Sequence, residues 1–270
     1  MLSNVLITKT QRNLCQGNAS LALKNIEEAL TICDRMAQES THGSMCFYRG
    51  LAYLALGREL DAHQDIDDYI KTAERADDCY GQALGHFYHA MVFERNREPC
   101  MALAELEMAK ELVSDGDPAL KGRLTAFIAH LWLRRGGLDE AMSLMAEATD
   151  LINNDVEPPE PINLGIAFLV YAELLAMKSS WDESGKAFQQ SIQALRASRY
   201  GLYLEALASC WYAETNIDLG HKTEGYERLQ RAKAIYNEMG NESQLAKIDG
   251  TITECECVSE EKKASSKMEY

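Results

Sequence analysis

The chain has 270 residues, 46% of them hydrophobic, and its formal net charge at pH 7 is −15. This composition is typical of a globular protein with a sizeable core and excludes a largely disordered chain. The negative charge repels phosphate backbones and anionic lipid surfaces, so we expect neither nucleic acid nor a membrane among the partners.

The N-terminal stretch MLSNVLITKTQRNLC lacks the long apolar region of a secretory signal peptide. The longest apolar run, residues 162–177, is interrupted by Asn163 and Glu173, which predicts a buried helix rather than a membrane span. The eight cysteines form no CxxC pair, so we expect reduced thiols in a cytoplasmic protein. Two thiolates alone, at Cys255 and Cys257, make a poor metal site, and we expect no metal or cofactor.

Hydrophobic periodicity predicts six pairs of helices followed by one more helix. The expected pairs are 3–15 with 18–37, 42–56 with 59–75, 79–95 with 98–114, 117–135 with 138–153, 162–178 with 181–197, and 201–219 with 222–239. The last helix, about 242–256, has Asn241 in a position suited to an N-cap.

The helix pairs share a repeating pattern of small residues. One small residue marks the second helix of each pair, and these residues recur at intervals of 39 to 43 positions: Ala22, Ala62, Ala102, Ala141, Ser184 and Gly225. A residue suited to a turn stands five positions earlier in most units: Gly17, Gly57, Gly136, Ser179 and Gly220, with Arg97 as the exception. Small residues let two helix axes approach closely, and stacked hairpins bury what one hairpin cannot.

This spacing, with the turn sequence GGLDEA at 136–141, resembles the tetratricopeptide repeat (TPR). The longer units resemble those of MalT-type transcription regulators and signal-transduction ATPases. The resemblance implies an all-α fold, a right-handed α-solenoid in one domain over 1–257, with 258–270 as a disordered tail. The implied repeats are 3–40, 41–78, 79–116, 117–157, 161–200 and 201–240, with a cap at 241–257.

In TPR proteins the first helix of each pair lines a concave groove that holds a partner. The resemblance places twelve residues there as candidate partner contacts: Phe47, Tyr48, Leu51, Phe87, Tyr88, Met91, Phe127, His130, Glu173, Trp211, Glu214 and Asp218. The groove would be an exposed apolar strip that becomes acidic toward the C-terminal repeats. It would suit a protein or peptide partner that is amphipathic with a basic end.

Other interpretations remain open from the sequence. The aromatic residues could meet across a closed core instead of lining a groove. The chain could be the ligand-sensing or autoinhibitory part of a MalT-like regulator or signal-transduction ATPase, and it could form a homodimer. No phosphate-binding loop, GxSxG or HExxH motif is present, so we expect a protein-interaction scaffold or adaptor and not an enzyme.

Overall fold

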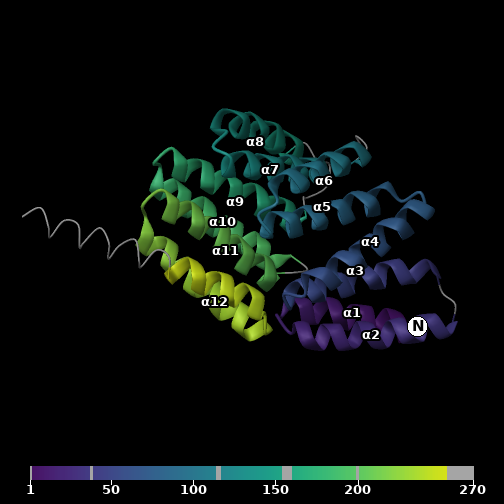
Figure 1. Ribbon diagram of the computed structural model, residues 1–270. Helices are drawn as coiled ribbons and strands as arrows, with labels where there is room; N and C mark the ends of the chain where they lie inside the picture. The colour runs from purple at the N-terminus through teal and green to yellow at the C-terminus, as the bar shows by residue number, and fades with distance from the viewer. Residues whose placement is uncertain (1, 37–38, 114–116, 154–159, 199–200, 254–270) are drawn as a thin grey trace, which may run out of the picture.

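A computed structural model describes residues 2–36, 39–113, 117–153, 160–198 and 201–253. The described part of the chain is all-α, and its labelled helices alternate in direction as six hairpins (Figure 1). They are α1 (Leu2–Cys15), α2 (Ala19–Met36), α3 (Glu39–Ala55), α4 (Glu59–Arg75), α5 (Cys79–Arg95), α6 (Pro99–Leu112), α7 (Pro118–Arg134), α8 (Leu138–Asn153), α9 (Pro161–Met177), α10 (Trp181–Ala197), α11 (Gly201–Asp218) and α12 (Lys222–Met239). A further helix covers 242–253.

The predicted fold class and helix pairs are therefore confirmed. Local chemistry explains where several helices begin. Pro99, Pro118 and Pro161 each take the first helical position, where a missing N–H costs nothing. The predicted tail, 258–270, and the cysteine pair at Cys255 and Cys257 lie outside the described residues.

The turn inside each hairpin uses a left-handed backbone conformation. Gly17, Gly57, Gly136 and Gly220 have φ between 75° and 90°, as the absence of a Cβ allows. Arg97, the exception in the sequence pattern, and Ser179 adopt the same conformation with φ of 60°. The geometry of the turn is therefore common to all six repeats, even where the residue type is not.

The small residues of the pattern lie where two helices of a hairpin cross. The Ser184 hydroxyl donates to the carbonyl of Ala172 at 2.7 Å, which joins α10 directly to the backbone of α9. A Cβ added at Gly225 would lie 2.9 Å from the Ala213 carbonyl, so only glycine fits there. Close backbone approach is thus the reason for the repeating small residues.

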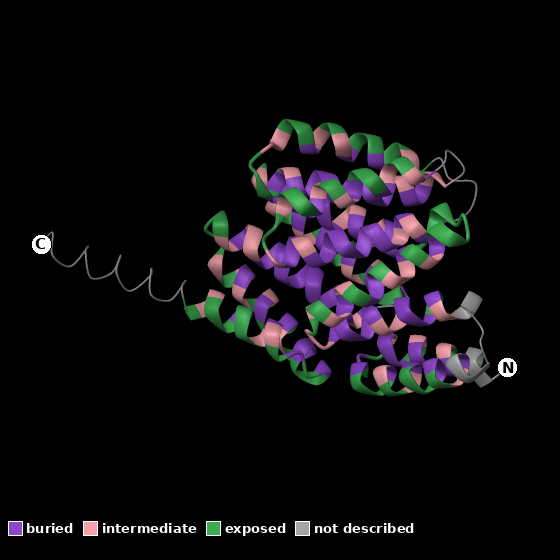
Figure 2. Ribbon diagram, turned by 45° about the vertical axis from the view of Figure 1, so that its right-hand side comes forward, coloured by how far each residue is buried: buried purple, intermediate pink, exposed green. Residues whose placement is uncertain are grey.

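The hairpins form an inner and an outer layer of helices. The inner helix α7 has 13 buried residues, whereas its outer neighbour α8 has four, spaced one turn apart. Figure 2 shows the buried positions gathered in the middle of the molecule and the exposed ones on the outer helices. Within the described ranges, no helix is long and apolar enough to cross a membrane.

The two ends of the solenoid meet, so the helices form a closed rather than an extended array. Figure 1 shows α12 beside the α1–α3 end of the molecule. The Asn241 amide donates to the carbonyls of Leu54 (3.3 Å) and Ala55 (3.0 Å) at the C-terminal end of α3. Lys247 lies 3.4 Å from the Glu59 carboxylate in α4. These contacts join residues more than 180 positions apart.

Asn241 also caps the helix that follows it, as the sequence predicts. Its side-chain oxygen accepts a hydrogen bond from the Gln244 backbone N–H at 3.0 Å. One fully buried amide therefore both begins the last helix and holds that helix to α3.

Replacing Asn241 with Ala should remove the cap and leave two buried carbonyls without this donor. We expect the free energy of unfolding to fall by about 2 kcal/mol, which urea titration monitored by circular dichroism would measure. Asn237→Ala, at an exposed position in α12, is the matched control and should change stability little. Equal losses in the two variants would contradict the role assigned to Asn241.

Candidate functional site

A chain of aromatic rings runs through the middle of the inner layer. Ring centroids are 5.3 Å apart for Phe47 and Tyr88, 5.3 Å for Phe87 and Tyr88, and 5.7 Å for Phe87 and Phe127. Trp211 continues the chain at 5.4 Å from Phe127. The rings come from α3, α5, α7 and α11, so they join helices of four repeats. Such edge and offset contacts are typical of a packed aromatic core.

These rings are core and not an exposed strip. Of the eight Phe, Tyr, Trp, Leu and Met residues predicted for the groove, seven are at most 5% exposed: Phe47, Leu51, Phe87, Tyr88, Met91, Phe127 and Trp211. Tyr48 is half-buried, and its hydroxyl contacts the Gln11 amide. The expectation of an exposed apolar groove is therefore wrong for these seven, and the closed-core interpretation describes them. The physical reason is the closure of the solenoid, which brings the concave faces of opposite repeats into contact.

Beside the aromatic chain lies a buried histidine between two carboxylates. His130 Nδ1 is 2.8 Å from the Glu173 carboxylate, and His130 Nε2 is 3.6 Å from that of Glu94. The imidazole is stacked on Phe127, and its centroid is 4.6 Å from that of the tilted Trp211 ring. Burial by itself lowers the pKa of His130, but the charges and hydrogen bonds of Glu173 and Glu94 outweigh it and raise the pKa to about 9.

Both carboxylates around His130 have second partners. The Trp211 indole N–H donates to Glu94 at 2.7 Å, and the Thr215 hydroxyl donates to Glu173 at 3.1 Å. Glu173 was predicted to face a partner, but it is 1% exposed and its oxygens are occupied by His130 and Thr215.

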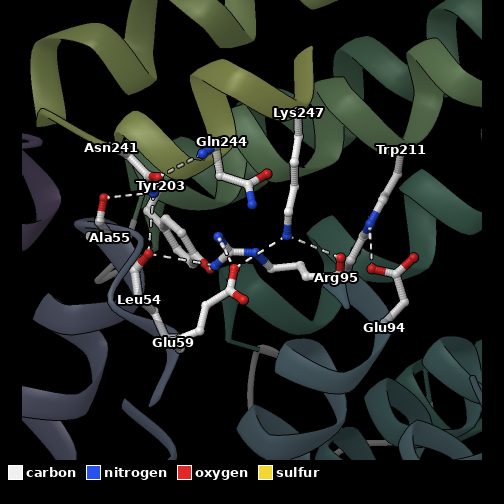
Figure 3. A network of polar contacts seen from close by, with 10 residues as sticks. All are labelled: Leu54, Ala55, Glu59, Glu94, Arg95, Tyr203, Trp211, Asn241, Gln244 and Lys247. Atoms are coloured by element: carbon white, nitrogen blue, oxygen red, sulfur yellow. Dashed lines mark hydrogen bonds and ion pairs between the residues drawn. The ribbon is translucent and has the colours of Figure 1, made fainter. Parts of the chain in front are cut away.

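Arg95 stands next to this cluster and connects it to the closure of the solenoid. Figure 3 shows its guanidinium between Tyr203 of α11 and Glu59 of α4. The guanidinium donates to the Tyr203 hydroxyl at 2.5 Å and lies 3.4 Å from the Glu59 carboxylate. Lys247 reaches the same Glu59 and also donates to the Arg95 carbonyl at 3.4 Å. The closing contacts and the buried ionic cluster are therefore one connected network.

This network forms the floor of two adjoining cavities of about 420 and 550 Å3, which we call the charged cleft. The two cavities share five lining residues: Glu94, Arg97, Arg134, Glu214 and Thr251. The cleft lies at the C-terminal ends of α5, α7, α9 and α11, and the helix 242–253 contributes one wall.

Charges of both signs line the charged cleft, whereas the sequence predicted only its carboxylates. Four carboxylates are matched by four cations: Glu94, Glu173, Glu214 and Asp218 against Arg95, Arg97, Arg134 and Lys247. Glu214 forms an ion pair with Arg134, while Asp218 is exposed at the rim. Partial burial raises the pKa of Glu214, although Arg134 opposes the shift. Apolar side chains, among them Leu131, Met177 and Ile217, complete the lining.

Sequence reasoning missed the cations of the cleft. Arg134 stands four residues after His130, the same step that separates Asp218 from Glu214. Extending the groove positions by one helical turn in α7 would have included Arg134. No such signal points to Arg95 or Lys247, because their positions depend on the contact between the second repeat and the C-terminal part of the chain.

No family model matches the sequence, and the search of curated proteins found no match. Solved structures are similar in fold. The apo form of RapI superposes with a TM-score of 0.65 at 10% identity, over 88% of this chain and 84% of that one. A Rap protein in complex with competence and sporulation factor superposes with a TM-score of 0.62 at 12% identity, over 95% of this chain and 75% of that one. NprR in complex with its cognate peptide NprX superposes with a TM-score of 0.59 at 15% identity, over 91% of this chain and 71% of that one.

A set of TPR-like repeats from a Podosopora anserina putative kinesin light chain gives a TM-score of 0.51 at 13% identity, over 72% of this chain and 96% of that one. The fold of the chain is that of a TPR-like helical repeat protein. The similarity at these identities concerns the fold, and the residues of the charged cleft are features of this chain.

The buried histidine of this TPR-like protein makes its stability depend on pH. Because the pKa of His130 rises from 6.5 to about 9 on folding, its contribution is fully present below pH 6.5 and is lost as the pH rises through 9. The shift corresponds to on the order of 3 kcal/mol for this fully buried group. We expect the difference in unfolding free energy between wild type and His130→Gln to shrink by that amount from pH 6 to pH 9.5 in urea titrations. Parallel pH curves for the two proteins would contradict the charged state of His130.

Proposed function

We propose that the protein is a non-catalytic binding scaffold that holds a peptide or protein segment in the charged cleft. The observation that carries the proposal is the cleft itself, where charged side chains of four inner helices converge. Two solved structures of similar fold contain a bound peptide or factor by name, NprX with NprR and competence and sporulation factor with a Rap protein. A binding role in this chain is consistent with theirs.

The shape and lining of the cleft favour an amphipathic segment. Its two adjoining cavities fall in the size range of small-ligand pockets, and together they would take several residues of an extended chain. Leu133, Met177 and Ile217 would receive an apolar side chain. Arg97 and Lys247 would donate hydrogen bonds to carbonyl or carboxylate oxygens of the same segment.

Glu214 and Asp218 are the residues that would hold the basic end of the segment. They lie at the C-terminal end of α11, where the helix dipole adds to the attraction for a cation. In the free protein Glu214 forms its ion pair with Arg134, and both side chains are more than a quarter exposed. Ion pairs at that exposure contribute only about 0–1 kcal/mol, so a basic residue of the partner could replace Arg134 at little cost.

The proposal assigns no partner role to the buried aromatic residues or to Glu173. A location in the cytoplasm belongs to the same proposal and is supported by the free thiols of Cys79, Cys100 and Cys210. If the chain is instead the ligand-sensing module of a MalT-like regulator, the same cleft would bind a small molecule. This alternative remains a prediction, and so does a homodimer.

The test is selection of peptides from a random 12-residue display library against the purified full chain, followed by fluorescence anisotropy. The selected peptides should combine apolar residues with a terminal Lys or Arg. Glu214→Gln should weaken their binding about tenfold, equivalent to about 1.4 kcal/mol. The matched control is Glu147→Gln, which breaks the exposed Lys110–Glu147 ion pair between α6 and α8 and should leave binding unchanged.

Two results would contradict the proposal. One is the recovery of no peptide with micromolar or tighter affinity. The other is a selected peptide that binds wild type and Glu214→Gln equally well.

A further inference from the structure

A separate cavity lies at the opposite ends of the inner helices. It has a volume of about 460 Å3, and four tyrosines line it, Tyr48, Tyr69, Tyr80 and Tyr88, so we call it the tyrosine cavity. Arg123 of α7 and the first residues of α9, Glu160 to Ile162, complete its lining. The buried aromatic chain separates this cavity from the charged cleft.

Arg123 is a buried cation at the wall of the tyrosine cavity. Only 2% of the residue is exposed, and its guanidinium lies 4.6 Å above the Phe87 ring. It forms no ion pair with any carboxylate in the described ranges, and its buried Nε has no hydrogen-bond partner there. Burying a guanidinium without an anion is unfavourable, so an anionic partner would be strongly favoured at this point.

The start of α9 supplies a second positive feature to the same cavity. This helix has 17 residues and begins at Pro161, and its N-cap Glu160 makes no side-chain capping hydrogen bond. Pro161 and Ile162 line the cavity. The partial positive charge of the helix N-terminus therefore acts on the space that Arg123 borders.

The tyrosines do not neutralise Arg123. Burial raises the pKa of Tyr69 and of Tyr88 well above the usual range, and the Arg123 charge only partly opposes this for Tyr88. Both phenols are therefore uncharged at neutral pH. They offer aromatic faces and polar hydroxyls around a positive charge, which suits a ligand with an aromatic body and an anionic end.

We propose that the tyrosine cavity binds a carboxylate carried on an aromatic or aliphatic body, with Arg123 and the N-terminus of α9 holding the carboxylate. The cavity volume is in the range of small-molecule sites. The exposed Glu160 carboxylate at its edge disfavours a dianion, which selects a carboxylate over a phosphate ester. The carboxylate can belong to a free acid or to a peptide C-terminus. This proposal does not depend on the function of the charged cleft.

Isothermal titration calorimetry of the full-length chain with 3-phenylpropanoate tests the proposal. We expect saturable binding of the acid and at least tenfold weaker binding of 3-phenylpropanamide, which has the same shape without the charge. Phenyl phosphate should bind more weakly than the acid. Acetyl-Ala-Ala-Phe with a free or an amidated C-terminus distinguishes the two sources of carboxylate, because only the free terminus should bind if peptides fit.

Two variants assign the binding to the tyrosine cavity. Arg123→Met keeps a long side chain beside the Phe87 ring without the charge, and it should weaken the binding of 3-phenylpropanoate at least tenfold. Glu160→Gln removes the repelling charge at the edge and should strengthen binding two- to fivefold. These shifts have opposite signs, so a general loss of fold cannot produce both.

Equal binding of the acid and the amide to the wild-type protein would overturn the proposal, and so would the absence of binding by every carboxylate probe. Tighter binding of phenyl phosphate would overturn the choice of a carboxylate. These measurements on wild type hold even if Arg123→Met fails to fold.

Discussion

The contact between Asn241 and the end of α3 is the interaction on which the rest of the structure depends. A stack of helical hairpins interacts only with its nearest neighbours, and its concave face is normally open. Here one buried amide bonds the Leu54 and Ala55 carbonyls, and Lys247 and Arg95 meet at Glu59 beside it. The C-terminal helix is thereby held to the second repeat, and the concave face becomes interior.

Closure moves the available binding space from the concave face to the two ends of the inner helices. The inner helices run in the same direction, so their N-termini lie at the tyrosine cavity and their C-termini at the charged cleft. Helix dipoles therefore favour an anion at one end and a cation at the other. The side chains agree with this polarity, with Arg123 at the first and Glu214 with Asp218 at the second.

Local patterns in the sequence predicted the fold well. Small residues recur in every unit and turn residues in all but one, so the helix pairs and most turns followed from spacing. The cap at Asn241 followed from the residue type at the start of the last helix. The same positions identified Trp211 and His130 as inward-facing, but spacing within a repeat does not reveal whether distant repeats touch. The sequence pattern could not single out Arg95 and Lys247, because their roles depend on contacts between distant repeats. It could not single out Arg123 either, because the role of Arg123 depends on the cavity around it.

The central claim is that the solenoid is closed in solution, and a zero-length cross-link tests it most directly. Carbodiimide treatment of dilute monomeric protein should join Lys247 to Glu59, whose atoms lie 3.4 Å apart, and peptide mass spectrometry would detect the product. The ion pair of Lys233 with Asp249, at 2.5 Å, joins α12 to the neighbouring helix 242–253 and serves as the internal standard. Closure predicts both cross-links within one molecule. Formation of the Lys233–Asp249 link without the Lys247–Glu59 link would contradict the account.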